Sequence, residues 1–156
     1  MLLTLAPPRN LRPIANTDAA ETNPSVRPDG KLVAFQSNGT GNSEVYVSPV
    51  DGSWRQPVSL AGGFAPKWSR TGNELYFRVS GTGGLDTLYS ARIQGTADVS
   101  VGEFKVVFAG VNLASGYAPL PGDSLFLMRP PAADAHRPFI VVLNFRQELD
   151  RLFQKK

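Results

Sequence analysis

A stretch of the chain recurs 42 residues further on, and this repeat restricts the fold more than any other feature. Residues 24–30 read PSVRPDG, and residues 66–72 read PKWSRTG. In both copies an apolar run follows the turn, at 33–35 and at 75–77. A weaker third copy at 117–122 begins 50 residues after its counterpart in the second copy. A period of about 40 to 50 residues is typical of folds that stack one supersecondary unit several times.

The repeated unit has the pattern of strands rather than helices. Short apolar runs alternate with turn residues, and the repeats lack the 3.6-residue periodicity that helical repeats would need. The 156 residues include 15 Gly and 13 Pro, which is above average usage and favours many turns between short strands. The sequence therefore predicts an all-β fold of beta-propeller blades, each with four antiparallel strands.

We expect three blades, at 16–62, 63–110 and 111–144, after the end of a preceding blade at 1–15. The predicted strands are 24–27, 32–36, 44–48 and 56–60 in the first blade, 65–68, 74–79, 86–93 and 104–108 in the second, and 113–119, 124–128 and 138–143 in the third. Since successive side chains of a strand point to opposite faces, Val45 and Val47 are expected to share a face that Tyr46 does not.

The last residues depart from the strand pattern. Apolar Phe145, Leu149, Leu152 and Phe153 recur at helical spacing, and Asn144 stands where a helix N-cap is expected. The sequence therefore predicts a short amphipathic C-terminal helix at 145–156.

The stretches "PSVRPDGKLVAFQS", "SEVYVSPVDG" and "PKWSRTGNELYF" resemble the WD-like propeller repeats of the TolB type. The resemblance assigns the structural repeat motif to Pro24, Asp29, Gly30, Pro66, Trp68, Gly72 and Gly122. The sequence departs from the family pattern at Arg27, where the family has Ser, and at Arg70 and Thr71, which replace Pro-Asp.

The stretch "FIVVLNFRQEL" at 139–149 looks like the C-terminal end of such propellers in large bacterial proteins. There the propeller follows a serine/threonine protein kinase domain or a winged-helix DNA-binding domain. The chain has no kinase signature, neither the Gly-rich loop with its Val-Ala-x-Lys strand nor the His-Arg-Asp loop. The resemblance therefore implies the sensor part of a larger signalling protein, with any kinase activity in other sequence.

The number of predicted blades is too small for a closed ring, because propellers typically have four to eight. One hypothesis is that the missing blades belong to the same longer chain; the other is a homo-oligomer that closes the ring. The run at 1–6 is too short and lacks the basic flank of a signal peptide, and no segment reaches the length of a membrane span. We expect a cytoplasmic protein if Met1 is the true start, and an extracytoplasmic or periplasmic one if the chain belongs to a longer receptor-type or TolB-like protein.

Composition argues against several classes of site. The net charge is +3 and the 16 Lys and Arg residues are scattered, whereas nucleic acid binding favours a clustered basic face. The chain has no Cys and a single His, so disulfides and thiolate zinc sites are excluded. The acidic residues that could still bind a metal are spread singly along the sequence. We therefore expect no nucleic acid partner, no metal and no cofactor.

No catalytic residue is predicted either. His136 has Asp134 nearby, but the segment is rich in Pro and Ala and the chain has no Gly-x-Ser-x-Gly elbow. The glycines at 81–84 precede a predicted strand, whereas a phosphate loop precedes a helix. Asp29 and Asp51 are interpreted as turn residues.

Binding is the expected function. One end of the blades would carry the dissimilar polar loops at 37–42, 79–85 and 129–136, and such loops carry specificity on a rigid frame. The candidate binding residues are Asn38, Asn42, Trp54, Thr82, Asp86, Asp134 and His136. We expect a non-catalytic module that recognises a protein, a peptide or a small ligand. The alternatives are a gating propeller of a prolyl-oligopeptidase-type hydrolase and a stand-alone periplasmic TolB-like protein.

Overall fold

The computed structural model is all-β, and its sheets are antiparallel. It describes residues 2–3, 11–15, 17–113, 116–120, 122, 126–128 and 140–141. The predicted helix at 145–156 lies outside these residues. No helix in the described part of the chain is long and apolar enough to cross a membrane.

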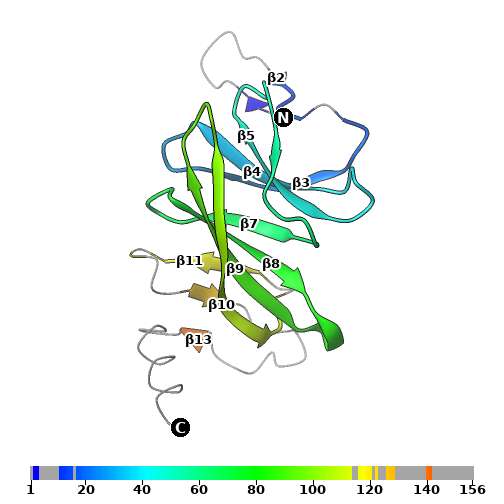
Figure 1. Ribbon diagram of the computed structural model, residues 1–156, viewed down its shortest axis with the longest axis vertical. Coiled ribbons are helices and arrows are strands. Elements are labelled where there is room, and N and C mark those ends of the chain that lie inside the picture. The colour runs from blue at the N-terminus through cyan, green and yellow to red at the C-terminus, as the bar shows by residue number, and fades with distance from the viewer. Residues whose placement is uncertain are drawn as a thin grey trace.

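Two complete four-stranded sheets form the centre of the molecule (Figure 1). The first sheet contains β3 (Glu21–Val26), β4 (Leu32–Ser37), β5 (Glu44–Pro49) and β6 (Gln56–Pro57), paired in chain order. The second sheet contains β7 (Phe64–Trp68), β8 (Glu74–Ser80), β9 (Asp86–Gln94) and β10 (Ser100–Val111), also in chain order. A 3₁₀ turn, η1 (Thr82–Gly84), joins β8 to β9.

Smaller sheets flank this pair. An N-terminal pair, β1 (Leu2–Leu3) and β2 (Leu11–Arg12), precedes the first sheet. The third sheet contains β11 (Tyr117–Pro119), β12 (Phe126–Met128) and β13 (Ile140–Val141). The sheets follow one another along the long axis of the molecule, and the described strands do not form a closed barrel (Figure 1).

The predicted strands coincide with observed ones, and the differences lie at their ends. The fourth strand of the first sheet ends at Pro57 rather than at residue 60. It ends early because the amides of Val58 and Ser59 both donate to the carbonyl of Val45, and Val58 turns into the space between the sheets. In contrast, β10 extends from Ser100 to Val111, well beyond the predicted 104–108.

The repeat is also present in the backbone geometry. Both β3 and β7 contain a register shift against the next strand. Each shift contains a non-glycine residue with positive φ, Asn23 at 53° and Ala65 at 49°. These two residues are 42 positions apart, which is the sequence period, so the bulge is part of the repeated unit.

A hydrophobic cluster joins the first and second sheets. It contains Leu32, Ala34, Val45, Val47 and Val58 from the first unit and Trp68, Leu75, Phe77, Ala91, Ile93 and Val99 from the second. Tyr46 lies on the other face of the first sheet, against Val33 and Phe35. The predicted alternation along β5 is confirmed, and Trp68 of the repeat motif lies in the core.

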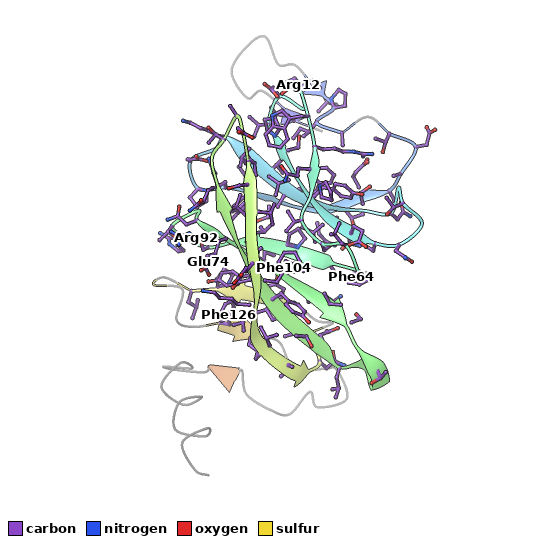
Figure 2. All side chains as sticks on the ribbon, in the orientation of Figure 1. Arg12, Phe64, Glu74, Arg92, Phe104 and Phe126 are labelled. Carbon is purple, nitrogen blue, oxygen red and sulfur yellow. The ribbon has the colours of Figure 1, made fainter. Side chains whose placement is uncertain are left out.

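A second cluster joins the second and third sheets. It contains Tyr76, Leu88, Leu113, Tyr117 and Phe126. The Phe126 ring, labelled in Figure 2, meets the Tyr76 ring edge-on at a centroid distance of 4.9 Å. The second sheet therefore buries one face against the first sheet and the other against the third, as stacked repeats do.

Candidate functional site

The edge strands β3, β7 and β11 lie side by side and connect the three sheets. The indole Nε1 of Trp68 donates to the carbonyl of Ser25 at 3.0 Å, and the backbone amide of Trp68 donates to the Ser25 hydroxyl at 3.3 Å. On the other side of β7, the Tyr117 hydroxyl donates to the carbonyl of Ala65 at 2.7 Å. Burial raises the pKa of the Tyr117 hydroxyl, so this group remains a donor.

A groove of about 360 Å³ runs along these strands. We call it the inner-strand groove; its lining residues are Ser25, Val26, Pro28, Lys67, Trp68, Ser69, Arg70 and Pro119. Val26 is 56% exposed although it is aliphatic, and the two charged residues of the lining, Lys67 and Arg70, are both basic. The groove is therefore a mixed apolar and cationic surface to which all three sheets contribute.

Arg27 connects the first two sheets beside this groove. Its side chain is only 8% exposed. It holds the Asp29 carboxylate with two hydrogen bonds, of 2.9 and 2.5 Å, and donates to the carbonyl of Gly95 at 2.8 Å. Its guanidinium also lies 5.8 Å from the centre of the Trp68 ring. The hydrogen bond from Arg27 lowers the pKa of Asp29 to about 2.

Asp29 also has the predicted role of a turn residue, because its Oδ1 accepts the backbone amide of Lys31 at 3.0 Å. Gly30 and Gly72 follow in the two equivalent turns with φ of 73° and 74°, a conformation that favours glycine. Gly122 also has positive φ, at 88°. The motif glycines therefore serve the backbone of the turns.

A second feature of the repeat is a buried carboxylate at the first residue of the third strand. Glu44 opens β5 and Asp86 opens β9, 42 residues apart. They are 7% and 3% exposed. Each accepts a backbone amide from the segment that leads to the next sheet, Gly62 for Glu44 and Leu113 for Asp86, both at 2.9 Å.

The remaining partners of the two carboxylates differ. Glu44 accepts a hydrogen bond from the Ser59 hydroxyl, which in turn accepts the backbone amide of Val45 at 2.8 Å. Asp86 forms a salt bridge of 3.0 Å with Arg78 and accepts the Ser80 hydroxyl at 3.0 Å. The same position therefore carries neutral partners in the first sheet and a cation in the second.

The described residues among the predicted binding residues have different surroundings. Asn38, Asn42 and Thr82 are exposed at the strand ends where the predicted loops lie. The Asn38 side chain accepts the backbone amide of Ala20 at 2.9 Å. Asp86 begins β9, at the start of the predicted strand 86–93, but it is buried and has internal partners. Its carboxylate is therefore occupied by the protein itself.

Trp54, one of the candidate binding residues, lies between β5 and β6. It is half-buried, with its side chain packed against the cluster between the first and second sheets. It also lines a separate pocket of about 340 Å³ with Ile14, Phe35 and Arg55. Asp134 and His136 lie outside the described residues.

Sequence reasoning did not identify Arg27, Glu44 or Lys67 as site residues. Glu44 could have been found from the repeat, because the acidic residue Asp86 stands one period of 42 residues later. The prediction that acidic residues are spread singly overlooked this relation. Arg27 differs from Ser69, its counterpart one period later, and it alone of the two donates a hydrogen bond to Gly95 of the second unit.

The described residues contain no group of three or more His, Cys, Asp or Glu side chains that could hold a metal ion. A scan against protein-family models and a search of curated proteins found no match for the chain. The TolB-type resemblance therefore stays a prediction from the repeat motif.

Proposed function

We propose that the chain is a non-catalytic recognition module of the beta-propeller type, acting within a larger signalling or sensor protein, and that the inner-strand groove binds its protein or peptide partner. The observation that carries the proposal is the convergence of β3, β7 and β11 on one groove. Propellers arrange the first strand of each blade around a central channel, so the first strands of neighbouring blades lie side by side.

The chemistry of the groove favours a peptide. Val26, Pro28 and Pro119 offer apolar contacts, while Lys67 and Arg70 attract carboxylate groups. A ring would need further sheets, which other copies or a longer chain would supply. The gating propeller and the stand-alone periplasmic protein stay as alternatives, and the TolB-type assignment itself belongs to this proposal.

A selection of random 12-residue peptides displayed on phage, with the full chain as bait, tests the binding role. Selected peptides are then titrated by calorimetry against the wild type, Val26→Asp and Lys67→Ala. We expect both variants to weaken binding at least tenfold, because they remove an apolar contact and a charge from the groove. Leu60→Asp is the matched control, since Leu60 is 79% exposed and lies outside the groove lining. Enrichment of no peptide, or equal binding by all variants, would contradict the proposal.

A further inference from the structure

The outer edges of the two complete sheets are very different. The first sheet ends in β6, which has two residues, one of them Pro57. The second ends in β10, with twelve residues and no proline. Short strands and prolines protect sheet edges against pairing with other chains. The edge of the second sheet lacks both of these protections.

The middle of β10 is exposed and apolar. Phe104 is 45% exposed and Val106 is 58% exposed. Glu103 and Lys105 flank Phe104 and are exposed as well, so this segment has both charge signs and no net charge. Figure 2 labels Phe104 on β10; its ring meets the Phe77 ring edge-on at 5.6 Å. Neutral segments with strong β-propensity and an exposed edge are well suited to strand pairing.

We propose that β10 is a homodimerisation edge, on which the β10 strand of a second copy pairs antiparallel in a register centred on Phe104. Two identical antiparallel strands are related by a two-fold axis perpendicular to the sheet. In an antiparallel pair, directly opposed side chains point to the same face of the sheet. The two-fold axis therefore passes between one residue and the same residue of the second copy. The charges around Phe104 then select the register.

With Phe104 at the centre, Glu103 of each copy lies opposite Lys105 of the other. This register forms two opposite-charge pairs and one aromatic pair, all of which stabilise neighbouring strands. Centring on Glu103 or on Lys105 would place identical charges opposite each other. The chosen register also extends the aromatic contact of Phe104 and Phe77 across the dimer.

Irregular pairing with β9 limits the length of this contact. The register between β10 and β9 shifts between Val101 and Phe104 and again between Val106 and Phe108. The first shift includes Gly102 and Glu103, so regular pairing runs from Phe104 to Val106 and the charge pairs of Glu103 lie at its border. The contact is therefore short, and we expect a dimer that dissociates on dilution. The edge is formed by the outer strand, so this inference does not depend on the role of the inner-strand groove.

Sedimentation equilibrium of the full chain tests the proposal through charge reversal. We expect a reversible dimer for the wild type. Glu103→Lys and Lys105→Glu should each weaken dimerisation at least tenfold, because like charges then face each other. A mixture of the two variants should form a heterodimer, and the double variant Glu103→Lys/Lys105→Glu should dimerise again, since both restore opposite pairs. Asp18→Lys, at an exposed residue, makes the same charge change as Glu103→Lys and should leave the dimer intact.

A wild type that stays monomeric at about 1 mM would overturn the proposal. A dimer that survives both single reversals would overturn it as well. A ring-closing oligomer is distinguishable, because its mass would not change in Glu103→Lys. Circular dichroism of each variant confirms that the sheets are retained, and the rescued double variant reports pairing even where a single variant is less stable.

Discussion

The first and second sheets have the same strand order and the same bulge, but different side chains hold them. At the start of the third strand, Glu44 has neutral partners and Asp86 has the cation Arg78. In the turn after the first strand, Arg27 reaches across to the second sheet, whereas its counterpart Ser69 bonds within its own turn. The repeat therefore preserves the positions at which the sheets are joined, while the side chains that join them vary.

The largest effect should come from the two buried carboxylates. Asp86→Ala leaves Arg78 without its carboxylate, and we expect a loss of about 3–5 kcal/mol in the free energy of unfolding. Glu44→Ala removes acceptors from neutral donors, and we expect a smaller loss of about 1–3 kcal/mol. Urea denaturation measures both.

Gln36 occupies in the first sheet the position that Arg78 has in the second, 42 residues later. The double variant Asp86→Ala/Arg78→Gln removes the charge along with its partner. It should therefore lose less stability than Asp86→Ala. The distinction between the two carboxylates would be refuted by equal losses in Asp86→Ala and Glu44→Ala. A double variant less stable than Asp86→Ala would refute it as well.

The strands were predictable from the sequence because their signals are local. The run 32–36 and the alternation around Tyr46 carry their burial pattern in adjacent residues. The ends of strands were less predictable, since the early end of β6 depends on Val58 packing against another sheet. The predicted strand 113–119 likewise begins only at Tyr117, because Leu113 belongs to the linker that Asp86 holds.

The site was less predictable than the strands, because its contacts join distant residues. The bond from Arg27 to Gly95 spans 68 positions, and the bond from Leu113 to Asp86 spans 27. No local pattern encodes such pairs. The repeat itself does relate Glu44 to Asp86, so aligning the units by polar as well as apolar residues would have identified both.

The next largest effect should come from Arg27. Arg27→Ala removes the contact with Gly95 and the packing on Trp68, and we expect a loss of about 2–3 kcal/mol in urea denaturation. Arg27→Lys should restore little of this, because an ammonium group cannot reproduce the two-pronged bond to Asp29. Ser69→Ala in the second sheet should lose only about 1 kcal/mol. Full rescue by Lys would show that Arg27 acts only as a charge.

Acid should remove part of the Arg27 contribution through Asp29. Its folded pKa of about 2 lies below its ordinary value of 3.8, so the Asp29 contribution is present above about pH 4 and lost as the pH falls through about 2. Because the carboxylate is 40% exposed, we expect Asp29→Asn to lose only about 1 kcal/mol at pH 7. Urea denaturation at pH 7, 4 and 2 should show this difference shrinking. In an Arg27→Ala background the same substitution should show much less pH dependence; an unchanged dependence would contradict the assigned cause.

The smallest effect should distinguish the bulges of the two sheets. Ala65 has φ of 49° in β7, a conformation that strains residues other than Gly, Asn and Asp by about 1–2 kcal/mol. Ala65→Gly relieves this strain but loses a methyl group that packs against the second cluster, so we expect a net gain of about 0.5 kcal/mol. Asn23→Gly should instead lose about 1 kcal/mol, because Asn tolerates this conformation and its side chain donates to Gln36. Thermal unfolding compares the two variants, and opposite shifts of the midpoint are the expected result. Shifts of the same sign would mean that backbone strain does not distinguish the two bulges.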